Sequence, residues 1–255
     1  MIRAGRMYKT IIENGFQGVI TKVSSRIKRK INDYKWQKIY KETSLESKFT
    51  QIYTQRLWTG SESVSGFGSG LEYTKNLRIN LQLIIEKFEI STILDLACGD
   101  CNWIKSFFRN HEVEYLGCDI VKPLIEKNRE LYGNDLVKFE VMNVVKDELP
   151  SAELVICRDL LFHLPNREIL KVLSNICRTE SRYLLLTSHI DDARDPFSNV
   201  DIEAGDFRRL DLFREPFCLP RSSILAFDDW MEPDPPRIMV LYNLQTLRDI
   251  WLTSL

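Results

Sequence analysis

The sequence predicts a doubly wound α/β domain preceded by a basic helical segment, and three observations support this prediction. Short, almost continuous apolar runs recur from residue 90 onward, as in the strands of a parallel sheet covered on both faces. Stretches with helical periodicity separate the runs, and such alternation indicates a doubly wound sheet. Polar and acidic residues follow the ends of the runs, where sheets of this kind bind their ligands.

The expected elements follow in order along the chain. A helix is predicted at about residues 72–88, from apolar residues at helical spacing. Five apolar runs predict strands at residues 93–96, 115–119, 137–141, 154–157 and 183–187. Helical stretches between them cover about residues 102–110, 122–132 and 166–179. After a loop-rich stretch, residues 224–230 and 237–244 are expected to form two closing strands.

The N-terminal part has a different character. Residues 22–58 contain neither Gly nor Pro, and their apolar residues recur at helical spacing. The segment that follows, residues 59–70, is rich in Gly and Ser and suits either a flexible linker or a loop close to a ligand. We expect residues 1–58 to form a basic helical extension and residues 59–255 the α/β domain. The extension and this Gly/Ser loop would fold over the ligand site as a lid.

Charge is unevenly distributed along the chain. Residues 1–50 hold twelve Lys and Arg against four Asp and Glu, a net charge of +8, whereas residues 51–255 carry −9. The basic segment is either a solvated helical face or an anchor for an anionic membrane or partner. No apolar run reaches the roughly 18–20 residues of a membrane span, and the N-terminus is a poor secretory signal. Six cysteines in this length do not form a disulfide framework, so we expect a cytoplasmic protein, with peripheral contact at the inner membrane face as an option.

Candidate ligand-binding residues follow four of the predicted strands. The first strand leads into Asp95 and a tight turn at Gly99, and the second ends at Asp119, 20 residues beyond that glycine. An acidic residue at this distance from a glycine turn is placed to bind a ribose diol. The third run ends at Asn143, and the fourth at Arg158 and Asp159.

These stretches resemble the motifs of a known family. The run ILDLACGDCNW resembles motif I of class I S-adenosylmethionine-dependent methyltransferases, and EYLGCDI, FEVMN and AELVICRDLLFHL resemble their motifs II, III and IV. The resemblance covers roughly residues 60–250. It implies a Rossmann-like, seven-stranded sheet whose last two strands form a reversed edge, with S-adenosylmethionine as cofactor. The flanking segments SGFGSGLEYTKNLR and GDFRRLDLFREPFCLP are similar to a bacterial subgroup linked to cell-surface glycan synthesis.

The resemblance also implies the cofactor-binding residues. Ala97 and Cys101 stand where the family usually has glycine, and Asn143 replaces the usual Asp that accepts from the adenine amino group. An amide oxygen can accept that hydrogen bond as well. A dehydrogenase is disfavoured, because the first glycine of G-x-G-x-x-G is missing. The implied cofactor-binding residues are Arg78, Asp95, Ala97, Cys98, Gly99, Asp100, Trp103, Asp119, Ile120, Asn143, Val144 and Arg158.

Two of these residues have a structural alternative. Asp95 either orients the turn and the water near the cofactor's amino group or caps a helix, and Trp103 is expected to pack against the turn. Cys98 and Cys101 also form a C-x-x-C, which is typical of zinc and redox sites. Because no second Cys or His pair accompanies it, we expect no metal and interpret the two cysteines as small residues packed around the cofactor.

Transfer of a methyl group to a hydroxyl benefits from a general base. The candidates are His163, which follows the fourth strand, His189, which ends the fifth, and Asp159. A buried structural histidine is the alternative for each imidazole. Arg208 and Arg209 suit an anionic acceptor such as a phosphate or sugar nucleotide, although exposed loop arginines need no function.

The function predicted from the sequence is O-methylation of a glycan or glycan precursor of capsule or lipopolysaccharide type. The alternatives are methylation of another small molecule or a nucleic acid, and a non-catalytic scaffold subunit with the same fold. The negative charge of residues 51–255 argues against a large phosphate-binding surface there. Intact Asp95, Gly99 and Asp119 argue against the scaffold.

Overall fold

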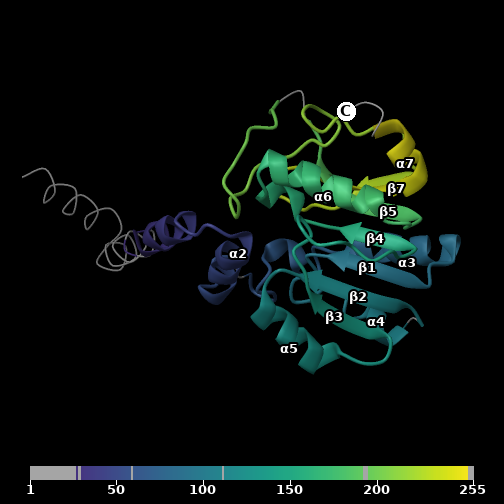
Figure 1. Ribbon diagram of the computed structural model, residues 1–255, viewed down its shortest axis with the longest axis horizontal. Coiled ribbons are helices and arrows are strands. Elements are labelled where there is room, and N and C mark those ends of the chain that lie inside the picture. The colour runs from purple at the N-terminus through teal and green to yellow at the C-terminus, as the bar shows by residue number, and fades with distance from the viewer. Residues whose placement is uncertain (1–26, 28–29, 59, 111, 192–194, 252–255) are drawn as a thin grey trace, which may run out of the picture. The chain divides into compact units, whose positions relative to one another are not determined.

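The computed structural model describes residues 27, 30–58, 60–110, 112–191 and 195–251 (Figure 1). The chain divides into two compact units, Met1–Thr43 and Ser44–Leu255. In the first unit, residues 30–40 are helical, whereas about half of the predicted basic extension, residues 1–26, 28 and 29, lies outside the described residues. The division at residue 43 assigns the last part of the expected extension to the second unit, which also holds the α/β domain.

A seven-stranded sheet forms the centre of the second unit, in the order β3-β2-β1-β4-β5-β7-β6. All seven predicted strands are confirmed, with small shifts at their ends. The pairs β3/β2, β2/β1, β1/β4 and β4/β5 are parallel, and β7 runs antiparallel to both β5 and β6. The strands are β1 (Thr92–Leu96), β2 (Glu114–Asp119), β3 (Val137–Val141), β4 (Leu154–Cys157), β5 (Tyr183–His189), β6 (Leu225–Asp228) and β7 (Arg237–Asn243).

The expected reversed edge of two strands is wrong in one respect. Only β7 is reversed, because it follows β6 through a short connection and inserts between β5 and β6. The edge strand β6 therefore points in the same direction as the five strands β1–β5. This arrangement brings the start of β7 to the same edge of the sheet as the end of β5, where Arg237 is paired with His189.

The helices differ from expectation at three places. The predicted helix over residues 22–58 is interrupted at residues 41–44, because the Ser44 hydroxyl accepts a hydrogen bond from the Ser47 amide and caps a new helix, α2 (Leu45–Thr54). The stretch at 102–110 forms only the short α4 (Phe107–Asn110), and α7 (Leu244–Trp251) was not predicted. The helices α3 (Lys75–Phe88), α5 (Lys122–Tyr132) and α6 (Asn166–Arg178) are confirmed. None of the described helices is both long and apolar enough to cross a membrane.

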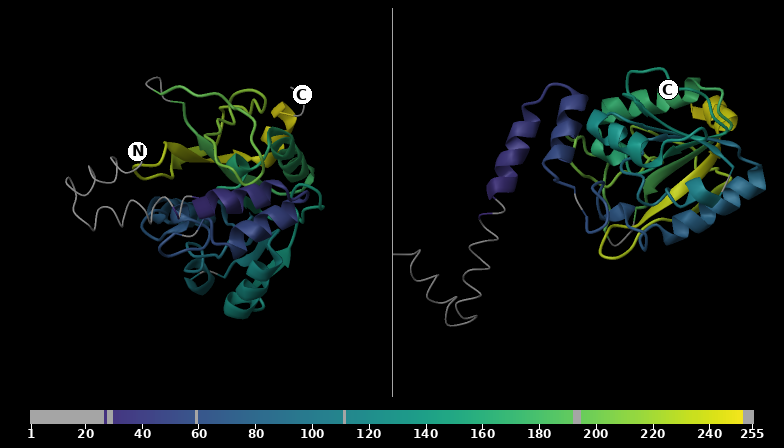
Figure 2. Two further views of the ribbon diagram at one scale, coloured as in Figure 1. Left: turned by 90° about the vertical axis from the view of Figure 1, so that its left-hand side faces the viewer. Right: turned by 90° about the horizontal axis from the view of Figure 1, so that it is seen from below.

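Helices cover both faces of the sheet, with α3 on one face and α6 on the other (Figure 2). The central strands β1 and β4 are almost fully buried, which explains their continuous apolar sequences. On the α3 face, Leu77, Leu81 and Ile84 are at most 1% exposed and belong to the same core cluster as residues of β1, β4 and β5. This packing leaves the carboxyl edge of the sheet to the loops, and the ligand site lies there.

Candidate functional site

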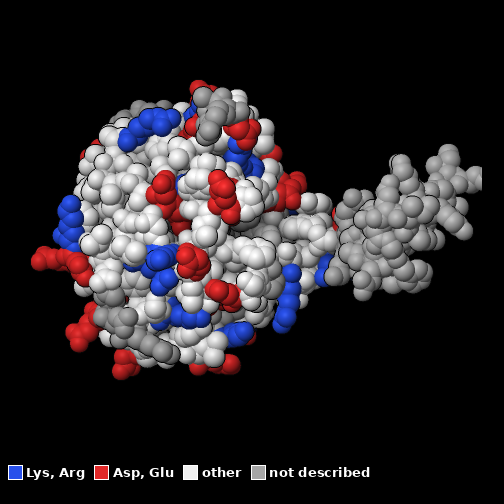
Figure 3. All heavy atoms as spheres, turned by 180° about the vertical axis from the view of Figure 1, so that it is seen from behind, with Lys and Arg blue, Asp and Glu red and all other residues white. Residues whose placement is uncertain are grey.

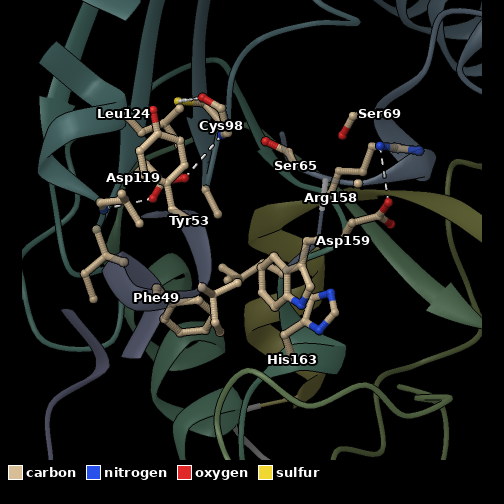
Figure 4. Close-up of a pocket in the computed structure, with 18 of the residues that line it drawn as sticks. Phe49, Tyr53, Ser65, Ser69, Cys98, Asp119, Leu124, Arg158, Asp159 and His163 are labelled. Atoms are coloured by element: carbon tan, nitrogen blue, oxygen red, sulfur yellow. Dashed lines mark hydrogen bonds and ion pairs between the residues drawn. The ribbon is translucent and has the colours of Figure 1, made fainter. Parts of the chain in front are cut away.

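A cavity of about 450 Å³ lies at the carboxyl ends of β1, β2 and β4 (Figure 4). Its walls come from α2, the Gly/Ser loop and the residues that follow these strands. Most of the residues predicted from the sequence meet here. Those that line the cavity are Asp95, Ala97, Cys98, Gly99, Trp103, Asp119, Ile120, Asn143, Val144, Arg158, Asp159 and His163.

Asp119 ends β2 and is held by the backbone around it. Its carboxylate accepts hydrogen bonds from the amides of Gly99 at 3.2 Å and Val121 at 3.0 Å. Burial raises the pKa of Asp119 to about 6, against these backbone hydrogen bonds, which lower it. Tyr53 and Leu124 line the same cavity as this carboxylate (Figure 4). The group is thus a fixed acceptor in an apolar surrounding, at the place predicted for a ribose.

The turn after β1 explains the two departures from the family pattern. Ala97, Gly99 and Cys101 all have positive φ angles, of 58°, 56° and 55°. The family's glycines at these positions suit this left-handed backbone, which side chains adopt at a cost of about 1–2 kcal/mol. Ala97 and Cys101 therefore keep the shape of the turn and accept strain. At Gly99 a Cβ would lie 2.4 Å from the Ser65 hydroxyl oxygen, so a side chain there would displace the Gly/Ser loop.

Asp95 is 2% exposed and accepts a hydrogen bond from the Tyr115 hydroxyl at 2.7 Å. Burial raises the pKa of Asp95 to about 7, while the Tyr115 hydroxyl and the charge of Arg158 lower it. The helix-cap alternative receives no support from these contacts, because no described backbone amide donates to this carboxylate. Asp95 is a buried acid beneath the cavity with a pKa close to neutrality.

The Gly/Ser loop packs on the turn after β1 through Asp100. The Asp100 carboxylate accepts hydrogen bonds from the Ser63 hydroxyl and the Val64 amide, both at 2.9 Å. The Asp100 amide in turn donates to the Ser65 hydroxyl at 3.1 Å. Asp100 therefore does not line the cavity as predicted, because its carboxylate holds the loop that covers the turn. Of the two alternatives for this segment, the structure shows the loop close to the ligand site.

Asn143 is buried between the β3 loop and α2. Its Oδ1 accepts from the Val145 amide at 3.1 Å, and its Nδ2 donates to Glu46 Oε1 of α2 at 2.6 Å. The predicted acceptor for an adenine amino group thus accepts one backbone hydrogen bond and retains a second lone pair. Glu46 is a residue of this region that the sequence reasoning did not identify.

A network of charged residues follows β4. Arg158 forms a two-point ion pair with Asp229, with contacts of 2.8 and 3.2 Å, and donates to the Gly68 carbonyl at 2.8 Å. Asp159 contacts Arg158 at 3.2 Å and Arg237 at 3.0 Å. Burial alone would raise the pKa of Asp159, but the two guanidinium groups hold it below its ordinary value. Asp159 is thus an ionised carboxylate that two arginines already engage.

His163 lies in the cavity wall with a defined tautomer. Its Nδ1 is 2.7 Å from the carbonyl oxygen of Asp206, which can only accept, so Nδ1 carries the proton and Nε2 has a free lone pair. The imidazole stacks on Trp58 with ring centroids 4.3 Å apart, and Phe162 and Phe207 contact it from other sides. Burial lowers the pKa of His163 to about 4. The ring is neutral near pH 7, in the form that accepts a proton.

Two other predicted residues lie away from the cavity. His189 is 0% exposed, its Nδ1 accepts from the Leu210 amide at 3.2 Å, and burial lowers its pKa to about 4. This is the structural histidine that the alternative describes. Arg78, on α3, donates to the Leu71 carbonyl at 2.8 Å and does not line the cavity. The contact ties α3 to Leu71, the residue that follows the Gly/Ser loop.

The two loop arginines also have protein partners. Arg208 is 5% exposed and donates to the Leu164 carbonyl at 2.9 Å and the Asn166 side chain at 2.8 Å. Arg209 forms an ion pair with Asp195 at 2.6 Å. Neither lines the cavity, so an anionic acceptor in it would not meet these groups.

Several residues that line the cavity were not predicted from the sequence. Phe49, Tyr53 and Trp58, on or just after α2, form its apolar wall, and Arg237 enters from the start of β7. The spacing of the aromatic residues on α2 is a signal that was available, since it places them on one helix face. Arg237 has no local signal, because only strand pairing brings it to Asp159, 78 residues away.

Cys98 and Cys101 pack around one amide. Asn128 Nδ2 lies 3.9 Å from the Cys98 sulfur and 3.7 Å from the Cys101 sulfur, and donates to the Gly99 carbonyl at 2.7 Å. Burial raises the pKa of the Cys98 thiol well above its ordinary value. Within the described ranges, no group of three or more His, Cys, Asp or Glu side chains is arranged to hold a metal ion.

Comparisons with known proteins agree with this architecture. Residues 93–180 match a family model described as a methyltransferase domain. The ribosomal RNA large subunit methyltransferase E of Methanococcus aeolicus is 32% identical over 94 residues, which are 33% of this chain and 35% of that protein. The chain thus spans about a third of the length of this curated relative.

Two solved structures show the same fold at low sequence identity. An O-methyltransferase family protein from Burkholderia thailandensis superposes with a TM-score of 0.53 at 14% identity, over 90% of this chain and 73% of that chain. The N-methyltransferase NodS from Bradyrhizobium japonicum WM9, in complex with S-adenosyl-L-homocysteine, gives a TM-score of 0.54 at 8% identity, over 75% and 97%. These similarities support the Rossmann-like fold of the domain.

Proposed function

Since this chain contains a methyltransferase domain whose cofactor is S-adenosylmethionine, we propose that it methylates a hydroxyl group of a glycan or glycan precursor, of capsule or lipopolysaccharide type. The observation that carries the proposal is His163, a neutral imidazole in the cavity wall with Nε2 free to accept a proton. A hydroxyl is the acceptor that profits most from such a base.

The residues at the cavity fit the cofactor. Asp119 supplies a carboxylate for the two ribose hydroxyls, and the turn at Gly99 lets the methionine part approach the backbone. Ile120 and Val144 contribute apolar walls for the adenine. The Val144 amide donates to no other described residue, so it is available to a ligand.

The chemistry divides between cofactor and protein. The cofactor supplies a methyl group on a sulfonium, and its transfer to a hydroxyl oxygen leaves S-adenosylhomocysteine and releases one proton. His163 Nε2 takes that proton and returns it to solvent, while Asp206 keeps the tautomer through its carbonyl. Asp159 remains ionised between Arg158 and Arg237, so we assign it to positioning rather than proton transfer.

Exposed aromatic rings at the cavity support a sugar as acceptor. Phe67 is 71% exposed and Phe207 54% exposed, and both line the cavity together with Trp58. Flat apolar rings suit the apolar faces of sugar rings. Arg237, one of two arginines that line the cavity, replaces Arg208 and Arg209 as a candidate contact for an acidic group of the acceptor.

A nucleic acid is the second candidate, because the curated relative is named as a ribosomal RNA methyltransferase. The face shown in Figure 3 carries Lys and Arg interspersed with Asp and Glu, without a continuous basic area. RNA binding depends on such an area to contact phosphates. The net charge of −9 on residues 51–255 favours the glycan over RNA, and RNA is an outcome of the test.

The test is an acceptor screen with purified protein and S-adenosylmethionine labelled in the methyl group. The panel contains nucleotide sugars, short oligosaccharides, small hydroxy compounds and ribosomal RNA. Label that enters a sugar fraction and survives mild alkali identifies a methyl ether and supports the proposal. Label in RNA, or label that mild alkali releases as from an ester, refutes it.

The basic N-terminal segment supports an additional proposal, reversible contact with the cytoplasmic face of an anionic membrane. The +8 charge of residues 1–50 provides an attraction of about 1 kcal/mol for each basic residue near such a surface. Co-sedimentation with phosphatidylserine vesicles should fall with added salt and with the triple change Lys28/Arg29/Lys30→Ser. The control variant changes Lys122, Lys127 and Lys138 to Ser. It removes the same number of positive charges, but from the second unit. Absence of binding to vesicles at low salt refutes the contact.

A further inference from the structure

Three large apolar side chains of the first unit are exposed to solvent. Ile27, Ile31 and Tyr34 are all helical, and they are 54%, 52% and 59% exposed. Their spacing, four and then three positions, is that of side chains on one helix face. Ile39, further along the helix at residues 30–40, is 0% exposed, so another side of this helix is buried. We call Ile27, Ile31 and Tyr34 the apolar stripe.

We propose that the apolar stripe inserts into the headgroup region of an anionic lipid surface. The inference rests on the membrane contact proposed above from the charge of residues 1–50. That contact requires only attraction between charges, whereas the stripe adds an apolar interaction that is specific to one helix face. A helix with an apolar face and Lys or Arg around it lies in the plane of a membrane interface in this way.

Basic residues accompany the stripe. Residues 27–40 contain five Lys and Arg and a single acid, Asp33. In the helix at residues 30–40, Lys30 precedes Ile31 and Lys35 follows Tyr34, so the two lysines lie on opposite sides of the stripe. Long lysine stems can run along an apolar surface while their ammonium groups reach the lipid phosphates.

The fourth-residue neighbour of Tyr34 shows this behaviour. Lys38 is exposed, and its Nζ lies 4.9 Å from the centroid of the Tyr34 ring. The ammonium group therefore sits over an aromatic ring that is itself open to solvent. Tyrosine suits the boundary between headgroups and acyl chains, because its ring is apolar and its hydroxyl is polar.

Charge complementarity selects the occupant of the stripe. A lipid surface provides both an apolar layer for the isoleucines and negative groups for the lysines. A second copy of this helix would cover the isoleucines but would bring lysines against lysines, and like charges repel. RNA would supply phosphates, but its backbone offers no apolar layer for aliphatic side chains.

The experiment measures co-sedimentation of the full chain with vesicles of phosphatidylserine and phosphatidylcholine in equal parts, at about 50 mM and about 150 mM NaCl. The test variant changes all three residues of the apolar stripe to Ala, the best helix former, so that the apolar surface shrinks while helix propensity is kept. A conservative variant, Ile27/Ile31→Leu with Tyr34→Phe, retains the apolar surface.

The matched control removes equally exposed apolar side chains from the second unit. It changes three residues to Ala that are 53%, 54% and 58% exposed, namely Ile79, Leu83 and Leu131. Circular dichroism and calorimetry with S-adenosylhomocysteine verify that every variant remains folded. Sedimentation velocity without vesicles reports whether the chain associates with itself.

The Ala variant of the stripe should bind the vesicles about 5- to 50-fold more weakly than wild type. This factor should be about the same at both salt concentrations, because salt does not screen apolar contacts. The effect of Lys28/Arg29/Lys30→Ser should instead shrink as salt is added. The conservative variant and the matched control should bind as wild type does.

Three results would overturn the proposal. If the Ala variant binds as wild type does, or the matched control loses as much, the stripe does not insert, and a contact by charge alone remains. If wild type is a dimer that the Ala variant separates, a second copy covers the stripe. If wild type ignores the vesicles at low salt, the membrane contact fails together with the insertion. None of these results bears on the acceptor screen.

Discussion

The Nδ1 atom of His163 lies 2.7 Å from the backbone carbonyl oxygen of Asp206, on a loop 43 residues further along the chain. A second hydrogen bond joins the same loop to this residue, because the Gly205 amide donates to the His163 carbonyl at 2.9 Å. The two contacts fix both the ring and its tautomer. Burial keeps the imidazole neutral by lowering its pKa to about 4, although the Asp206 carbonyl and the charge of Asp159 both favour the protonated form.

His163→Ala should lower turnover by roughly 10²–10⁴-fold and leave S-adenosylhomocysteine affinity within about two-fold of wild type. The reason is that the imidazole takes the proton of the hydroxyl group that is methylated. It makes no contact with the ribose or the adenine of the cofactor. Steady-state kinetics with the acceptor from the screen, together with calorimetry, provide the measurement. His189→Ala is the comparison, since it removes a buried histidine outside the cavity. Equal losses of turnover in both variants would mean that packing, not proton transfer, is responsible.

The pH profile follows from the same imidazole. Its pKa of about 4 means that Nε2 is unprotonated at any higher pH, so turnover should be nearly constant from about pH 5.5 to pH 8. Activity should fall only as the pH approaches 4, because protonation removes the lone pair. The measurement is the initial rate with both the acceptor and S-adenosylmethionine at saturating concentration, because cofactor affinity itself falls below about pH 6. A check that the protein stays folded accompanies each pH value. A limb centred near 6.5 would show an ordinary solvated histidine and contradict the structure.

Asp119→Ala should weaken S-adenosylhomocysteine binding by about 1.5–3 kcal/mol, from the loss of charge-assisted hydrogen bonds to the ribose. The wild-type affinity should also fall as the pH drops through about 6, where the carboxylate of the empty site takes up a proton. Calorimetry between pH 5 and pH 8 measures both effects. The affinity of Asp119→Asn should not depend on pH in this range. If the affinities of wild type and Asp119→Asn vary with pH to the same extent, this carboxylate is not the source of the pH dependence.

Asp95→Asn should stabilise the cofactor-free protein at pH 8. The pKa of Asp95 is about 7 in the folded protein against an ordinary 3.8, so the folded state holds this proton more tightly than the unfolded state. Stability is therefore lost as the pH rises from 3.8 through 7, and an Asn avoids that loss while still accepting from Tyr115. The gain is on the order of 2–4 kcal/mol.

Urea unfolding of wild type and Asp95→Asn at pH 4, 6 and 8 measures this gain. The difference between the two proteins should grow from near zero at pH 4 to its full value at pH 8. A difference that is the same at all three values would show that the amide changes packing and not ionisation.

Much of the architecture was predictable because it depends on local pattern. The apolar runs that became β1 and β4 are buried on both faces, and the acidic residue 20 positions after Gly99 did meet the turn at that glycine. The helix break before α2 escaped prediction, because a single serine hydroxyl at residue 44 decides it. The direction of β6 escaped prediction as well, since strand direction depends on which neighbour the strand pairs with.

By itself, the sequence determined the alternation of strands and helices, the turn at Gly99 and the acidic residue Asp119, because periodicity and short-range spacing encode them. Only the tertiary structure decided which polar groups are free. It engaged Asn143 with Glu46 and left Nε2 of His163 as an acceptor, through contacts across 97 and 43 residues. Whether a side chain binds a ligand or a neighbour depends on burial and on the partner that packing brings to it, and no local pattern contains that information.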